Sequence, residues 1–114
     1  MKWTDKDIVD WHIKTFPDAD LPSQLMKLEE ELKEFYEAIH KKDNKSIRQE
    51  LADVYIVCNV LRNRYKSYVG LYILHHFFFS DKTMKCVYKK MDINVQRTWV
   101  KVNGVYRHKD IDTD

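Results

Sequence analysis

The sequence predicts an all-helical bundle that ends in a short irregular or hairpin tail. Two observations favour helices. Apolar residues recur three and four positions apart over long stretches, and the 114 residues include only two glycines and two prolines. A composition of 44% hydrophobic and 33% charged residues is typical of a compact folded chain and argues against disorder. The length is that of one ordinary domain, so we expect a single helical domain over residues 1–114.

The first expected helix begins after Thr4, which together with Asp7 has the form of a capping box. It is expected to end before Pro17. A polar connector follows, and Ser23 at its end is a candidate N-cap for the next helix.

The strongest pattern predicts two consecutive amphipathic helices within residues 24–65, separated by a short polar turn near residue 43. Ser46 and Gln49 form a second capping box, which is expected to start the later helix. A short connection implies that the two helices pack antiparallel. Their apolar stripes are Leu25, Leu28, Leu32, Phe35 and Ile39 in the first helix and Ile47, Leu51, Val54, Cys58 and Leu61 in the second.

The C-terminal half gives weaker signals. Residues 69–79 are apolar almost all round, which fits either a buried helix or a subunit interface. Residues 81–96 have a basic helical pattern. Alternating residues around Asn103 and Gly104 then predict a small hairpin or an extended tail.

Charge and hydropathy restrict the expected partners and compartment. The net charge of +2, from 20 basic and 18 acidic residues, gives little support to a nucleic-acid partner. The longest apolar run is shorter than the roughly 20 residues that cross a bilayer, so no membrane partner is expected. The first residues lack the apolar segment of a signal peptide, and Cys58 and Cys86 lack CxxC spacing. We therefore expect a cytoplasmic protein, in the host cytoplasm if the gene is viral.

Two pairs of carboxylates carry the functional prediction. Each pair is spaced three residues apart and lies at the edge of an apolar stripe, so the pairs meet if the two stripes pack together. Such close acids repel one another, and a hard divalent cation such as Mg²⁺ would relieve the repulsion. The alternative is a solvated acidic surface, but repetition on successive helices favours a metal site. The four acids are Glu31, Glu34, Glu50 and Asp53.

Residues 27–34, Lys-Leu-Glu-Glu-Glu-Leu-Lys-Glu, are followed after fifteen residues by Glu-Leu-Ala-Asp-Val at 50–54. This arrangement resembles the signature of MazG-like nucleoside triphosphate pyrophosphohydrolases, Glu-Glu-x-x-Glu, a spacer and Glu-x-x-Asp. The similarity covers about residues 24–65. Looser similarity at residues 11–16 and 89–99 resembles phage-type members of the family.

The resemblance implies a MazG-like helical bundle that assembles as a homodimer or homotetramer. It also implies Mg²⁺-dependent hydrolysis of a nucleoside triphosphate between the α- and β-phosphates, with Mn²⁺ able to substitute. The four acids would hold the metal, and one of them or Glu30 would accept a proton from water. Deoxynucleotides, with purines slightly ahead, are expected from the resemblance alone.

Substrate contacts are expected from both ends of the chain. Phosphates would be bound by Lys27, Lys89, Lys90 and Arg97, and Asn94 would bind a phosphate or the sugar. Gln24 and the aromatic residues Trp11, Phe16 and Trp99 are candidates for contact with the base, although aromatic residues more often belong to a core. Asn59 is interpreted as solvent-facing.

Other functions fit parts of the same pattern. A dUTP or dCTP pyrophosphatase and a phosphoribosyl-ATP pyrophosphohydrolase would use the same four acids. A non-catalytic helical module is the alternative from another class. In that case the basic residues 82–97 would contact nucleic acid, and the acids would be surface charge.

Overall fold

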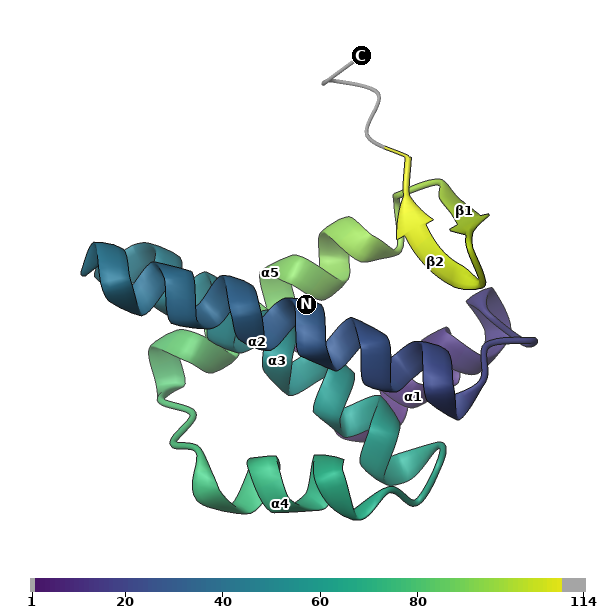
Figure 1. The fold of residues 1–114 in the computed structure, drawn as a ribbon, viewed down its shortest axis with the longest axis horizontal. Coiled ribbons are helices and arrows are strands. Elements are labelled where there is room, and N and C mark those ends of the chain that lie inside the picture. Colours follow the sequence, from purple (N-terminus) through teal and green to yellow (C-terminus); the bar gives the residue numbers. More distant parts are fainter. Residues whose placement is uncertain (1, 110–114) are drawn as a thin grey trace.

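The computed structural model describes residues 2–109, and this part of the chain forms five helices followed by one β-hairpin (Figure 1). The prediction of an all-helical bundle with a short C-terminal hairpin is confirmed. The elements are α1 (Asp5–Thr15), α2 (Leu21–Lys41), α3 (Asn44–Asn63), α4 (Tyr68–His76), α5 (Asp81–Asn94), β1 (Trp99–Val102) and β2 (Val105–His108).

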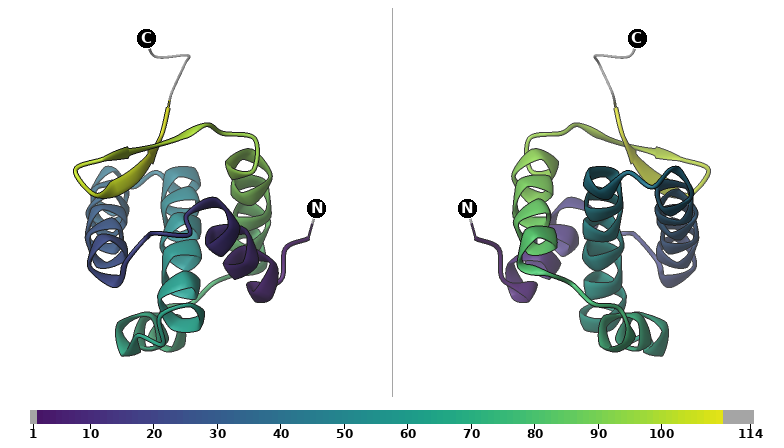
Figure 2. Two further views of the ribbon diagram at one scale, coloured as in Figure 1. Left: turned by 90° about the vertical axis from the view of Figure 1, so that its right-hand side faces the viewer. Right: turned by 90° about the vertical axis from the view of Figure 1, so that its left-hand side faces the viewer.

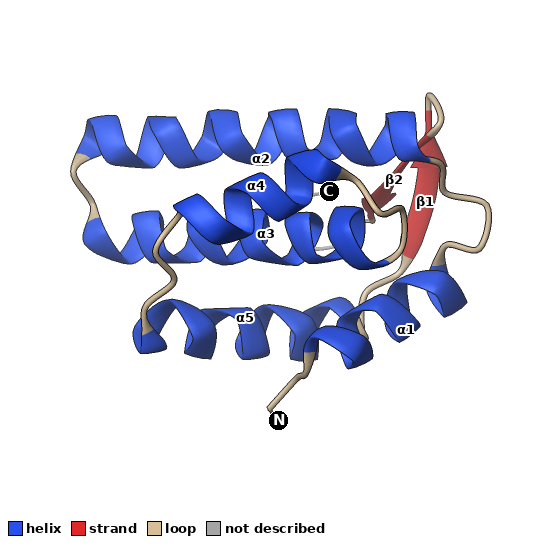
Figure 3. Ribbon diagram, turned by 90° about the horizontal axis from the view of Figure 1, so that it is seen from below, coloured by secondary structure: helices blue, strands red, loops and turns tan. Residues whose placement is uncertain are grey.

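Helix α3 is the centre of the bundle and packs against α1, α2, α4 and α5. Seen end-on, α2, α3 and α5 lie in a row; the hairpin crosses one edge of this row and α4 crosses the opposite edge (Figure 2). The antiparallel course predicted for α2 and α3 is confirmed (Figure 3). Of the helices described, none is both long and apolar enough to cross a membrane.

Two apolar clusters meet at α3, one on each side of it. The first cluster joins α3 to α1 and α5 and contains Ile8, Ala52, Ile56, Val60, Val87 and Met91. The second joins α3 to α2 and α4 and contains Leu28, Val54, Val57, Cys58, Leu61 and Ile73. The helix therefore buries two faces, whereas its sequence pattern predicted a single stripe.

The double burial of α3 corrects the interpretation of Asn59. This residue is fully buried, and its side-chain amide donates a hydrogen bond of 3.1 Å to the carboxylate of Asp5 in α1. The prediction that it faces solvent was wrong, because α3 is packed on both sides and almost none of its surface is exposed near Asn59. The hydrogen bond between the buried Asn59 amide and the charged Asp5 carboxylate stabilises the packing of α1 against α3.

Aspartates, not serines, start the two long helices. Asp20 caps α2 by accepting a 2.9 Å hydrogen bond from the backbone N–H of Ser23, and Asp43 caps α3 in the same way, 3.1 Å from the N–H of Lys45. The predictions of N-caps at Ser23 and Ser46 were wrong. An anionic acceptor interacts more favourably with the positive end of a helix than a hydroxyl does. The capping box of Thr4 and Asp7 at the start of α1 is confirmed.

Helix α4 is buried on one face only. Gly70 lies so close to α3 that an added Cβ would be 2.6 Å from the carbonyl oxygen of Cys58. Tyr68 and Tyr72 point to the exterior, with 84% and 63% of their surface exposed. The apolar segment is thus a helix that packs against α3 and leaves an aromatic outer face.

The hairpin is closed by the Asn103-Gly104 turn, where both residues have positive φ angles, 49° and 80°. Such angles favour asparagine and glycine in a two-residue hairpin turn. Lys101 in β1 forms a 2.9 Å ion pair with Asp18, and Arg107 in β2 forms a 2.8 Å ion pair with Glu30 in α2. These contacts hold the hairpin over the N-terminal half of α2.

Candidate active site

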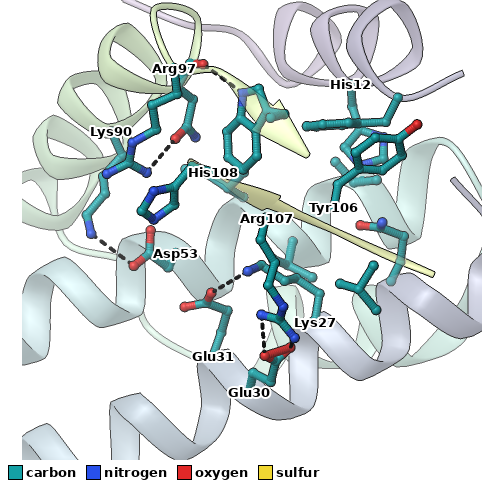
Figure 4. A pocket seen from close by; sticks show the side chains of 18 of the residues that line it. His12, Lys27, Glu30, Glu31, Asp53, Lys90, Arg97, Tyr106, Arg107 and His108 are labelled. Atoms are coloured by element: carbon teal, nitrogen blue, oxygen red, sulfur yellow. Dashed lines mark hydrogen bonds and ion pairs between the residues drawn. The ribbon is translucent and has the colours of Figure 1, made fainter. Parts of the chain in front are cut away.

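A pocket of about 480 Å³ lies beneath the hairpin and is bounded by α1, α2, α3, α5 and both strands of the hairpin. Glu31 and Asp53 lie on one side of it and His12 and Tyr106 on the other (Figure 4). We call these two sides the acidic end and the aromatic end. The acidic end contains Glu30, Glu31, Glu34, Glu50 and Asp53; the aromatic end contains Trp11, His12, Phe16, Gln24, Trp99 and Tyr106.

Three of the four predicted acids come together at the acidic end. Glu31 of α2 faces Glu50 and Asp53 of α3, and each offers a carboxylate oxygen within 4.8 Å of the other two. Glu50 and Asp53 share one face of α3 because they are three residues apart. Glu34 also lines the pocket, but it is exposed and lies outside this group of three.

The three acids are buried close together, so their ionised forms repel one another. Burial, followed by the charge of Asp53, raises the pKa of Glu31 to about 8. Burial and the same neighbour raise the pKa of Glu50 to about 7. Burial also raises the pKa of Asp53, although Lys90 opposes this effect. All three carboxyls are therefore easier to protonate than ordinary acids.

Two carboxylate oxygens at the acidic end have no hydrogen-bond partner among the described residues. They are Oε2 of Glu31 and Oε2 of Glu50, both buried. Burying an acceptor without a partner is unfavourable. A hard divalent cation with oxygen ligands would satisfy both atoms and neutralise the repulsion, so these residues fit such an ion.

Cationic side chains surround the acids. Lys27 lies 3.7 Å from Glu31 on the same helix, and Lys90 of α5 lies 2.9 Å from Asp53 (Figure 4). Glu30 differs from the group of three, because its ion pair with Arg107 lowers its pKa. The acidic end thus combines a compact group of acids with cations on α2, α5 and β2.

The structure places most of the predicted substrate residues in the pocket. Lys27, Lys90, Asn94, Arg97, Trp11 and Gln24 all line it. Lys89 does not: it is exposed on another face of α5, because consecutive helical residues point about 100° apart. Arg97 donates a 3.3 Å hydrogen bond to the side-chain oxygen of Asn94.

Four further lining residues with polar side chains were not predicted as site residues. His12 belongs to α1, and Tyr106, Arg107 and His108 belong to β2 (Figure 4). No local motif marks them, because they reach the pocket only through the packing of α1 and the folding of the hairpin over α2. The turn signal at Asn103-Gly104 indicated a hairpin, but not the surface that it covers.

Packed rings form the aromatic end. Trp11 and Phe16 make an edge-to-face contact with ring centres 5.4 Å apart, and Trp99 lies 5.9 Å and 5.1 Å from them. Tyr106 packs on Phe16 at 4.6 Å. The rings therefore form both a small core beneath the hairpin and the apolar wall of the pocket.

The fold and site define an all-helical protein with a candidate divalent-metal centre at one end of a partly aromatic pocket. Residues 21–70 match the model of the MazG nucleotide pyrophosphohydrolase domain, which confirms the resemblance predicted from the carboxylate motifs. The matched segment spans α2, α3 and the start of α4, so the part of the chain that is similar to a MazG domain is the helix pair that carries all the acids of the site. Comparisons with curated proteins and with solved structures give no match.

Proposed function

We propose that the protein is a Mg²⁺-dependent pyrophosphohydrolase that cleaves a nucleoside triphosphate between its α- and β-phosphates. The products are a nucleoside monophosphate and pyrophosphate. The observation that carries the proposal is the pair of buried, unpartnered oxygens of Glu31 and Glu50, which lie beside Asp53 in a pocket lined by cations. The match to the MazG domain supports the reaction class.

Glu31, Glu50 and Asp53 would hold the divalent ion, and Glu34, which lines the pocket from its exposed side, would complete the ligand set. When bound, the ion supplies neutralisation of the phosphate charge and makes an attacking water more acidic. One of the carboxylates at the acidic end would accept the proton of this water. The pKa of Glu30 is lowered by Arg107, which stabilises its ionised form, so Glu30 is a weaker base than Glu31 and Glu50, whose pKa values are raised.

Lys27, Lys90 and Arg107 would bind the phosphates. Each already contacts a carboxylate of the acidic end, so each lies within reach of an anion bound there. Fixed cations stabilise the negative charge that develops on departing pyrophosphate. The base would then bind at the aromatic end, because a base needs an apolar surface with few polar groups.

The test is a screen of the common ribo- and deoxynucleoside triphosphates with Mg²⁺, with products identified by ³¹P NMR. We expect pyrophosphate and a monophosphate from wild type. Glu50→Gln and Asp53→Asn should lose this activity and stay folded. Glu37→Gln is the matched control, because Glu37 is exposed on the same helix as Glu31 and outside the pocket. Full activity of either site variant, or release of orthophosphate, would overturn the proposal.

The single domain is also proposed to assemble as a homodimer or homotetramer. An apolar groove between α2 and α4 supports this assembly; it is lined by Leu32, Tyr36, Tyr68, Val69, Tyr72, Ile73 and Phe77. Exposed aromatic surface of this kind is common at subunit interfaces. Sedimentation velocity of wild type and Tyr72→Glu tests it, and a wild-type monomer at all concentrations would contradict it.

A further inference from the structure

Arg107 and Glu30 form a two-point ion pair at the edge of the pocket. One terminal nitrogen of the guanidinium lies 2.8 Å from Oε1 of the carboxylate, and the other donates a hydrogen bond of 3.2 Å to Oε2 (Figure 4). Both side chains line the pocket, and both are half-buried. The two residues are 77 positions apart in the sequence, so they meet only because the hairpin folds onto α2.

A second contact fixes the strand that carries Arg107. Lys101 and Tyr106 are paired across the hairpin, and both bind the carboxylate of Asp18 in the connector before α2. The ammonium of Lys101 lies 2.9 Å from Oδ2 of this carboxylate, and the hydroxyl of Tyr106 donates to Oδ1. Tyr106 is the neighbour of Arg107 in β2. Arg107 is thus held at its guanidinium by Glu30 and, through its neighbour, at its backbone by Asp18.

The ion pair leaves most of the hydrogen-bond donors of Arg107 available. A guanidinium has five N–H groups, and a two-point pair with a carboxylate uses at most two of them. Within residues 2–109, the guanidinium has no hydrogen bond to any residue other than Glu30. Its remaining donors lie in a plane that Glu30 fixes. A phosphate that binds them does not have to order the side chain, and such ordering weakens binding by roughly 2- to 10-fold.

Glu30 is separate from the acids that are proposed to hold the metal. Those acids are Glu31, Glu50 and Asp53, whose carboxylate oxygens lie within 4.8 Å of one another, and Glu30 is not part of the group. It points to another side of α2 than Glu31 does, because consecutive helical residues point about 100° apart. Both of its oxygens contact the guanidinium of Arg107. The role of Glu30 in the pocket is therefore found in this ion pair.

We infer that Glu30 is a positioning residue for phosphate recognition. It holds the guanidinium of Arg107 in one orientation at the acidic end, and it neither binds the metal nor accepts the proton of the attacking water. The inference rests on the proposed function, in which Arg107 binds the phosphates. The opposite role gives the opposite expectation: if Glu30 only competed with the phosphates for Arg107, removal of Glu30 would increase the contribution of Arg107 to substrate binding.

A double-mutant cycle distinguishes the two roles, with wild type, Glu30→Met, Arg107→Met and the double variant. We expect Arg107→Met to raise KM for the nucleotide about 10-fold when Glu30 is present, and less than about 3-fold in the Glu30→Met background, because an unheld guanidinium contributes less. Long-range repulsion between Glu30 and the phosphates is common to both members of each comparison, so it cancels. Equal factors in the two backgrounds, or a larger factor in Glu30→Met, would overturn the inference.

Mn²⁺ binding and kcat test what Glu30 does not do. The matched control is Glu37→Met, at an exposed position of α2 outside the pocket. Without nucleotide, Glu30→Met should bind Mn²⁺ within about 3-fold of this control, whereas loss of a metal ligand weakens binding at least 10-fold. The kcat of Glu30→Met should also stay within about 3-fold, whereas loss of a general base lowers kcat about 100-fold or more. Either of the larger losses would overturn the inference.

Calorimetry with Ca²⁺ in place of Mg²⁺ separates this inference from the proposed function. The same cycle is measured as Kd for the four common deoxynucleoside triphosphates. The expected coupling in Kd, without hydrolysis of any nucleotide in Mg²⁺, would overturn the proposed function and support the role of Glu30. Hydrolysis by all four proteins without this coupling would overturn the role of Glu30 and leave the proposed function standing. No binding of any of these nucleotides by wild type would overturn both.

Discussion

Replacing Glu31 with glutamine should stabilise the metal-free protein, and the gain should increase with pH. Burial and the charge of Asp53 raise the pKa of Glu31 from an ordinary 4.5 to about 8. The folded protein therefore holds this proton more tightly than the unfolded chain does. Stability that is present below pH 4.5 is lost as the pH rises towards 8, because the unfolded chain ionises first. Glutamine cannot ionise and avoids this loss.

The size of the effect follows from the two pKa values. A tenfold change in proton affinity corresponds to about 1.4 kcal/mol. The difference in free energy of unfolding between variant and wild type should therefore widen by up to about 4 kcal/mol from pH 5 to pH 8.5. Any fixed difference in hydrogen bonding between a glutamine amide and a protonated carboxyl is the same at both pH values. The change of this difference with pH is therefore easier to interpret than the difference in free energy of unfolding at a single pH.

Urea denaturation in EDTA at pH 5 and pH 8.5 measures this widening. The control is Glu37→Gln, an identical change at an exposed position of α2, which should show no widening. With Mg²⁺ present, wild type should regain stability at pH 8.5, because the ion binds only the folded site. A difference between Glu31→Gln and wild type that is equal at both pH values would refute the electrostatic account of the site.

Three further predictions concern packing and substrate contacts. Gly70→Ala should lower the free energy of unfolding by about 1–3 kcal/mol without changing metal affinity, because its Cβ would lie against the backbone of α3; unchanged stability in urea would contradict the close approach of α4. Asn59→Ala should lower it by about 1–3 kcal/mol through loss of the buried hydrogen bond to Asp5, and a neutral result would contradict the assigned burial. Arg107→Met should raise KM for the nucleotide about 10-fold while metal binding without nucleotide stays unchanged, and an unchanged KM would remove Arg107 from the phosphate site.

The sequence was most informative for the two long helices, where the apolar spacing and the acidic residues lie in the same segments. Apolar spacing predicted α2 and α3, and their antiparallel packing then brings Glu31 next to Glu50 and Asp53. Both the fold class and the main acidic group thus depend on contacts between two neighbouring helices, for which sequence spacing is a sufficient guide. The turn at Asn103-Gly104 likewise predicted the hairpin from local geometry alone.

Features that depend on distant packing could not be predicted in the same way. Asn59 is buried only because α1 covers a second face of α3, and the pattern of α3 alone does not show this. Arg107 reaches the pocket because ion pairs fold the hairpin onto the connector before α2 and onto α2 itself, more than 70 residues away in the sequence. His12 is positioned by Arg64 from the far end of α3. Each case requires contacts between segments that are far apart in the chain.

The central claim is that Glu31, Glu50 and Asp53 bind a divalent cation, and Mn²⁺ binding followed by electron paramagnetic resonance tests it directly. The free ion gives a strong six-line signal that weakens on binding, so titration of the protein into Mn²⁺ measures the bound fraction. Wild type and Glu37→Gln should bind the ion equally, and Asp53→Asn and Glu50→Gln should bind it at least 10-fold more weakly. Equal binding by all four proteins, or no binding by wild type, would contradict the account.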